Sequence, residues 1–250
     1  MRLIAATFAV ALAAACSGGG DIASLAERAQ AAATTTIPPS TTTTAGLVRT
    51  GEPLEIVEQG VSSFPDPFDP GATLGGYGVV LRNPNPDVIA AGVRVITRVL
   101  NSLGEELVTD RTLINGVMPR QRMALGRTLI EPVEDPAQLH VSVEVSAWLE
   151  PASTTGRLMA EDVVTEPEPN GGAVTRFTVR STWPESEEGV DVTAVYRGAD
   201  GRILSAESTT LPLVPPSGEV PSQIRLLSPI PDLTTTEVFV GRGLAAQTTG

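Results

Sequence analysis

The sequence predicts an all-β protein with two tandem β-sandwich domains, which follow an export signal and a disordered Thr/Pro linker. Short stretches of alternating apolar and polar residues, separated by Gly, Pro and Asn turns, are typical of sandwich strands. Helical periodicity of useful length is missing after the linker. The chain also matches itself when Gly104 is aligned with Gly201, an offset of 97 residues. We expect domains at about 47–158 and 159–244.

The first fifteen residues predict a signal peptide. Arg2 precedes a short apolar run and the small residues Ala13–Ala15, and Cys16 follows directly. The run is well below the roughly 20 residues that a membrane-spanning helix needs. This segment resembles the lipobox of bacterial lipoproteins, and the resemblance implies that Cys16 receives a diacylglyceryl group and that cleavage occurs before it. The alternative is a secreted protein cut near Ala15, with Cys16 as a spare thiol.

Cys16 is the one cysteine of the chain, so it forms no internal disulfide, and this favours the lipid. Residues 16–46 are expected to form the anchor and a disordered linker, because the Thr- and Pro-rich stretch Thr34–Thr44 favours an extended chain. Its threonines are either a bare spacer or sites of O-glycosylation. The tail at 245–250 is also expected to be disordered.

The two repeats each predict a strand, a turn and a strand, with Val93–Leu107 aligned over Val190–Leu204. A period of two places one row of each first strand in a core. These rows are Val93, Val95, Thr97 and Val99 in the first repeat and Val190, Val192, Ala194 and Tyr196 in the second.

Further strands align at nearly the same offset. Val141–Val143 lies over Val238–Val240, and a gap of one residue places Val79 and Leu81 over Phe177 and Val179. Each repeat then reaches a Pro-containing turn, at Asn83–Pro86 and Ser181–Pro184.

Three segments resemble parts of the immunoglobulin-like (Ig-like) modules of bacterial envelope lipoproteins, notably the FxLYD type. They are Val79–Asn85, Val192–Gly201 and Met118–Gln121. The Asn-Pro-Asn of the first is also similar to late-embryogenesis-abundant (LEA14-type) domains. Both resemblances imply an Ig-like β-sandwich.

Charge and residue types argue against several functions. The net charge of −12 disfavours nucleic acid as a partner. The one histidine, His140, is expected to be a strand-face residue and not a catalytic base, and the single cysteine leaves too few ligands for a zinc site. We therefore expect no catalytic residues and no cofactor. Gly75–Gly78 is expected to be a bend that enters a strand, because it lacks the strand and helix of a phosphate-binding loop.

Two acidic clusters and one tryptophan are further candidates. Asp66 and Asp69 are candidate calcium ligands, although the neighbouring prolines more simply indicate turns. Glu185–Glu188 is expected to be a solvated loop. Trp183 is either an exposed binding anchor or a turn-packing residue, and the large rings in general are expected in the cores.

These observations predict a non-enzymatic envelope lipoprotein on the extracytoplasmic side of the cell membrane. Its lipid would contact the membrane, and its sheet edges and turn loops would bind an envelope protein partner. The alternative is a surface receptor with a small-ligand or ion site between the two domains.

Overall fold

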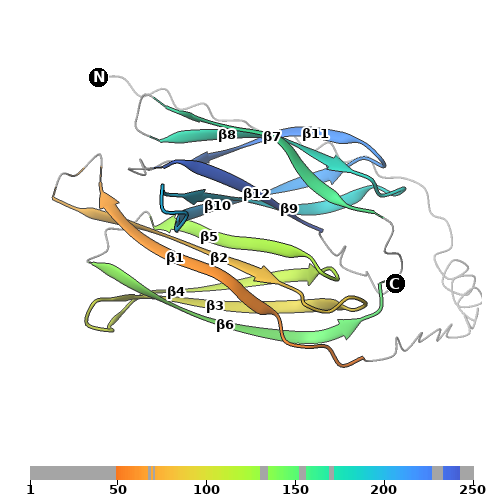
Figure 1. Cartoon of the computed structure of the whole chain (residues 1–250), viewed down its shortest axis with the longest axis horizontal. Helices are drawn as coiled ribbons and strands as arrows, with labels where there is room; N and C mark the ends of the chain where they lie inside the picture. The colour runs from red at the N-terminus through yellow and green to blue at the C-terminus, as the bar shows by residue number, and fades with distance from the viewer. Residues whose placement is uncertain are drawn as a thin grey trace, which may run out of the picture. The chain divides into compact units, whose positions relative to one another are not determined.

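The computed structural model in Figure 1 describes residues 49–66, 69, 71–129, 135–151, 156–168, 172–226 and 233–242. The expected signal peptide, the lipidation site Cys16, the linker at 16–46 and the tail at 245–250 lie outside the described residues. All the described residues belong to one compact unit.

The described residues form strands and turns and no helix, so the predicted all-β class is confirmed. The first six strands are β1 (Glu55–Pro65), β2 (Thr73–Arg82), β3 (Ile89–Asn101), β4 (Glu106–Val117), β5 (Arg122–Leu129) and β6 (Pro136–Leu149). The other six are β7 (Leu158–Pro167), β8 (Ala173–Ser181), β9 (Glu187–Arg197), β10 (Ile203–Val214), β11 (Glu219–Leu226) and β12 (Thr235–Gly241).

The strands pair into four antiparallel sheets of three strands, with the orders β1-β2-β5, β4-β3-β6, β11-β8-β7 and β10-β9-β12. The first two sheets enclose one apolar core, and the last two enclose another. Each pair is therefore a β-sandwich, as the sequence predicted. The second sandwich begins with β7 at Leu158.

The sheet orders repeat along the chain. Sheet β4-β3-β6 of the first sandwich corresponds to β10-β9-β12 of the second, and β1-β2-β5 corresponds to β7-β8-β11. The two predicted rows on β3 and β9 are buried in their cores, as expected. Gly104 and Gly201 occupy equivalent hairpin turns, where their positive φ angles of 82° and 79° suit glycine.

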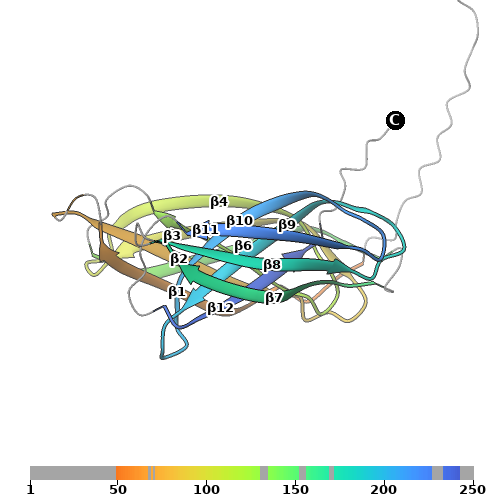
Figure 2. The same ribbon diagram turned by 90° about the horizontal axis from the view of Figure 1, so that it is seen from above.

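The two sandwiches stack face to face, so that the sheets lie in four successive layers (Figure 1). Sheets β1-β2-β5 and β10-β9-β12 are the inner pair, and a third apolar cluster lies between them. Figure 2 shows the strands of all layers running along the same long direction, as in aligned sheet packing. The third apolar cluster, between the two inner sheets, consists of Val80, Ala124, Val195, Ile203, Ala206 and Phe239.

Candidate functional site at the junction of the two sandwiches

A row of three glycines allows the inner sheets to approach closely. Gly60, Gly78 and Gly126 are paired across β1, β2 and β5. A Cβ atom on Gly60 would lie 2.3 Å from the backbone oxygen of Ile203, and one on Gly78 would lie 2.7 Å from the Ile203 side chain. One on Gly126 would lie 2.9 Å from the Cβ of Ala206.

The expectation that Gly75–Gly78 forms a bend is therefore wrong. The segment lies within β2 as regular strand, and its glycines make room for β10.

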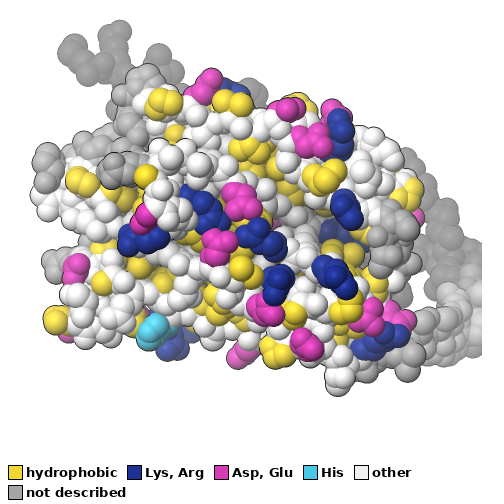
Figure 3. Space-filling view, in the orientation of Figure 1, with side chains coloured by type: hydrophobic (Ala, Val, Ile, Leu, Met, Phe, Trp, Pro, Cys, Tyr) yellow, Lys and Arg dark blue, Asp and Glu magenta, His cyan; other side chains and the backbone are white. Residues whose placement is uncertain are grey.

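A closed ring of ion pairs joins the two sandwiches on the face seen in Figure 3, where basic and acidic side chains alternate across the middle. Arg197 contacts Glu58 at 2.5 Å and Glu237 at 3.0 Å. Arg122 contacts the same two carboxylates at 2.9 and 3.4 Å. Because Glu58 and Arg122 belong to the first sandwich and the other two to the second, the ring fixes their relative position.

A second polar group lies on β2, β4 and β5 in the first sandwich. Asp110 accepts hydrogen bonds from the Tyr77 hydroxyl at 2.7 Å and from two nitrogens of Arg127 at 2.8 Å each. Burial raises the pKa of Asp110, but the hydrogen bonds from Arg127 and Tyr77 outweigh it and hold the pKa below its usual value. Asp110 is therefore a structural carboxylate that stays ionised.

Glu207 connects β10 to the edge of β5. Its carboxylate accepts a hydrogen bond from the backbone N–H of Thr128 at 3.0 Å. Burial raises the pKa of Glu207 above its ordinary value, and the bond from Thr128 opposes this rise. The side chain thus satisfies a backbone donor that an edge strand would otherwise leave unpaired.

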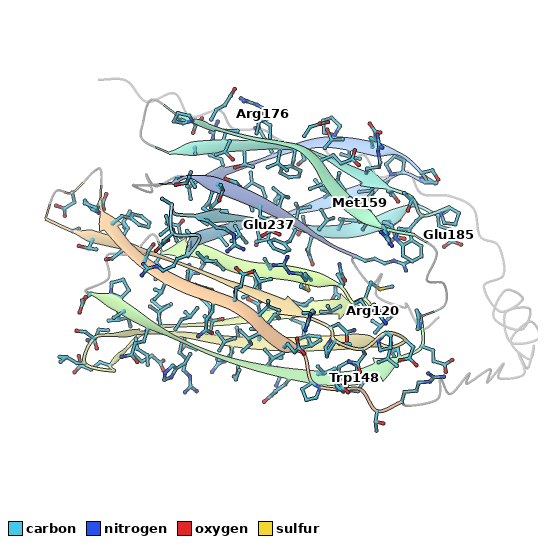
Figure 4. All side chains as sticks on the ribbon, viewed as in Figure 1. Arg120, Trp148, Met159, Arg176, Glu185 and Glu237 are labelled. Carbon is cyan, nitrogen blue, oxygen red and sulfur yellow. The ribbon has the colours of Figure 1, made fainter. Side chains whose placement is uncertain are left out.

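A pocket of about 490 Å³ opens at one end of the junction. Its walls come from the Pro86 turn and the Met118–Gln121 turn of the first sandwich, and from Gly156–Met159, Trp183 and Arg242 of the second. Figure 4 shows Arg120 and Met159 on opposite sides of this junction. Gln121 bridges the sandwiches next to the pocket by donating a hydrogen bond to the Val240 carbonyl at 3.0 Å.

A buried carboxylate supports one wall of the pocket. Glu187 is 2% exposed and contacts the Arg242 guanidinium at 2.5 Å. Arg242 in turn lies over the Trp183 ring, 4.2 Å from its centroid, in a cation–π contact. The expectation that all of Glu185–Glu188 is a solvated loop is therefore wrong for Glu187, which opens β9 and is buried by these neighbours.

Trp183 is itself buried, so of the two alternatives the turn-packing role holds and the exposed anchor does not. A Cβ on Gly156 would lie 2.2 Å from the indole, which shows how closely the backbone before β7 packs against this ring.

The larger hollow at the junction, about 940 Å³, follows β1 and the β9–β10 hairpin. Ser62 donates a hydrogen bond across it to the Leu204 carbonyl at 2.5 Å. Asp200 and Arg202 on its rim pair with each other at 3.2 Å. Its lining combines small residues with larger side chains such as Phe64 and Leu139, and its one basic side chain, Arg202, is already paired.

The structure places the other sequence candidates apart from the junction pocket. Asp69 accepts a hydrogen bond from the Gly71 N–H at 3.1 Å, which is a turn-forming role, and the Asp66 N–H donates to the Ala72 carbonyl. No cluster of three or more potential metal ligands occurs among the described residues. His140 is exposed on β6 opposite Arg98, on a strand face as expected.

None of the described residues forms a helix of the length and apolarity required to cross a membrane.

Comparisons with known proteins give no family. No family model matches the chain, and no curated protein matches it. The solved structures include a β-glucuronidase of Parabacteroides merdae, with 13% identity and a TM-score of 0.23, over 72% of this chain and 29% of that one. They also include the tandem CBM22-1-CBM22-2 domains of Paenibacillus barcinonensis Xyn10C, with 9% identity and a TM-score of 0.15, over 78% of this chain and 91% of that one. The chain thus spans less than a third of the glucuronidase.

Proposed function

We propose that this chain is a non-enzymatic lipoprotein of the cell envelope that binds a protein partner through a sheet edge. In this proposal the lipid on Cys16 holds the chain at the extracytoplasmic face of the cell membrane, and the Thr/Pro linker carries the stacked sandwiches away from it. Several acyl chains on one cysteine bind a bilayer firmly, whereas a single chain binds only marginally.

The distribution of exposed apolar side chains supports the proposal. Every large apolar side chain that is exposed on a strand belongs to a strand at the edge of its sheet. The central strands β2, β3, β8 and β9 have none among the described residues. An edge strand offers unpaired backbone groups to an incoming extended segment, and exposed side chains beside it supply specificity. The residues are Ile56, Val57, Leu113, Leu149, Met159, Val164 and Leu213.

Among these edges, β4 is the best suited to pair with a partner strand. It is twelve residues long, and Arg111 and Leu113 alternate as exposed side chains along it. Leu113 is 67% exposed. The pairing of β4 with β3 shifts register at Leu107, beside the hairpin turn, and is regular from Val108 to Val117. The edges β1 and β7 also contain register shifts, and the shift in β7 lies in the middle of the strand, where it disturbs the regular spacing that strand addition requires.

The anchor is tested by Cys16→Ala in the native cell. We expect this variant to lose incorporation of a clickable fatty acid and to leave the membrane fraction, because no other residue of the chain is proposed to carry lipid. Retention of both the label and the membrane association by Cys16→Ala would refute the anchor.

The partner surface is tested separately by photo-crosslinking in intact cells. A photoreactive residue at position 113 should give a discrete product with an envelope protein, because this side chain would lie beside the added strand. The matched control is position 149 on β6, the opposite edge of the same sheet, where no product is expected. Failure to crosslink from position 113, or equal products from both positions, would contradict binding along β4.

A further inference from the structure

We propose that the pocket formed by Met118–Gln121, Gly156–Met159, Trp183 and Arg242 binds an organic oxyanion, meaning a carboxylate or phosphate group attached to an apolar body. This inference depends neither on the lipid anchor nor on the edge of β4. It follows from the charges that line the pocket, from the way they are held, and from a comparison of the two repeats.

Unpaired positive charge gathers at this pocket in an acidic protein. Arg111, Arg120 and Arg157 are the arginines that form no ion pair among the described residues, and two of the three line the pocket. Arg242 adds a third guanidinium, whose charge is balanced from behind by Glu187. Figure 3 shows basic side chains bordering a recess toward the right-hand end of this face. Guanidinium groups bind carboxylates and phosphates in a bidentate manner. The positive charges that line this pocket therefore favour an oxyanion as its ligand.

The third guanidinium is fixed before any ligand arrives. Glu187 holds Arg242 at 2.5 Å and has a side chain that is only 3% exposed, while Trp183 supports the guanidinium plane at 4.2 Å. The second carboxylate oxygen of Glu187 is buried and has no hydrogen-bond partner among the described residues. A group held by buried neighbours loses little freedom on binding, which favours affinity.

The two repeats form equivalent turns with the same hydrogen bonds. Comparing them shows which side chains the turn itself does not need. The Asn85 N–H donates to Asn83 at 3.0 Å, and the Trp183 N–H donates to Ser181 at 3.1 Å in the second repeat. The Arg120 N–H donates to the Asn85 carbonyl at 3.0 Å, and the Ser217 N–H donates to the Trp183 carbonyl at 2.8 Å.

Arg120 and Ser217 both have positive φ angles, of 59° and 47°. Because serine forms the same turn in the second repeat, the turn does not require the arginine side chain. Arginine at this position therefore points to a role in the pocket that Arg120 lines.

Apolar side chains complete the pocket. Met118 and Met159 line it from the two sandwiches, together with Pro86 and the indole of Trp183. A volume of about 490 Å³ lies within the range of small-molecule sites, which are concave and largely apolar with a few polar groups. The ligand that fits is therefore a small anion with an apolar or flat body, and not a bare inorganic ion.

The test is calorimetric titration of the full-length chain in detergent with phenyl phosphate and with benzoate. Neutral benzamide and inorganic phosphate are the matched controls for charge and for the apolar body. We expect at least one of the two aromatic anions to bind with a dissociation constant below about 1 mM, the range that a few charge-assisted bonds can supply. In a Trp148→Phe background, Trp183 is the sole indole, and its fluorescence should change with the same dissociation constant.

Variants locate the binding. Arg120→Gln and Arg157→Gln should each weaken binding by about tenfold, as expected for loss of one charge-assisted bond. Arg111→Gln removes an equally unpaired charge from β4, outside the pocket, and should leave binding unchanged. Melting curves of all three variants show whether they remain folded.

The proposal is overturned if neither aromatic anion gives a saturable signal. It is equally overturned if benzamide or inorganic phosphate binds as tightly as the anions, or if Arg111→Gln weakens binding as much as the pocket variants.

Discussion

The two tyrosines of the chain are buried, one in each sandwich, at Tyr77 and Tyr196. Burial raises the pKa of Tyr196 to about 12. Burial also raises the pKa of Tyr77, and the hydrogen bond to Asp110 and its negative charge raise it further. Each hydroxyl therefore reports on the packing of its own sandwich.

We predict that the protein loses stability as the pH rises from about 10 toward 12. An unfolded tyrosine ionises near pH 10, whereas the folded side chains stay protonated, so the stabilising contribution is complete below pH 10 and is lost above it. For Tyr196 the loss is on the order of 2 kcal/mol. Denaturant unfolding at a series of pH values, read together with tyrosinate absorbance, measures this loss.

In Tyr77→Phe, Tyr196 is the only ionisable phenol, so the tyrosinate absorbance of this variant reports on the second sandwich alone. The native variant should then titrate near pH 12. Ionisation of the folded variant near pH 10 would show that Tyr196 is accessible to water.

At the scale of strands, β2 and β9 are the central strands of the two inner sheets, and both of their faces are covered. One face of each strand packs into its own core, and the other packs against the inner sheet of the neighbouring sandwich. The glycine row on β1, β2 and β5 sets how closely those inner sheets approach.

Gly60→Ala should destabilise the protein by about 2 kcal/mol, since inserting a methyl group into a closely packed contact typically costs 1–3 kcal/mol. The added Cβ would meet a backbone oxygen of β10, which has little freedom to move. Gly71→Ala is the control, because its Cβ would make only an ordinary contact at 3.5 Å. Chemical denaturation of both variants measures the difference, and equal stability would contradict the close approach.

The sequence predicted the strands well, because their side-chain period and turn residues are local signals. The alternation of valines with Arg94 and Arg98 correctly indicated a strand with one buried face. On β9 the alternation of Val190 and Val192 with polar residues ends in the continuous apolar run Ala194–Tyr196, which is a local signal for burial on both faces.

The site was harder to predict from the sequence. Glu187 and Trp183 are close in sequence, but Arg242 reaches them only through the pairing of β12 with β9. Arg120 and Arg157 lie on different sandwiches, and only the stacking of those sandwiches places them in one pocket. No local pattern specifies how two separately folded sandwiches meet.

At the scale of the whole molecule, the junction combines a small apolar cluster with the ring of Glu58, Arg122, Arg197 and Glu237. Ala206 belongs to this apolar cluster and is completely buried. Two sandwiches that share such an interface are expected to unfold together.

Calorimetry of the wild-type chain should show a single transition, with equal calorimetric and van't Hoff enthalpies. Ala206→Arg should divide it into two transitions, because an unpaired buried charge costs several kcal/mol and forces the junction open. Leu213→Arg, on the exposed part of the same strand, is the matched control and should keep one transition. Two transitions in the wild-type chain would show that the sandwiches are independent.

The stack joins two unlike faces, since β1-β2-β5 of the first sandwich meets β10-β9-β12 of the second, the counterpart of β4-β3-β6. A head-to-tail relation of this kind has no built-in end and can extend into a fibre of many molecules. On the outer sheet β7-β8-β11, Val164, Arg176 and Gln223 occupy the places of the three glycines, and all three side chains are exposed. These larger side chains would keep the sandwich of a second molecule from packing as closely on this outer sheet as the inner sheets pack at the glycines. We therefore expect the chain not to add further molecules at its second sandwich.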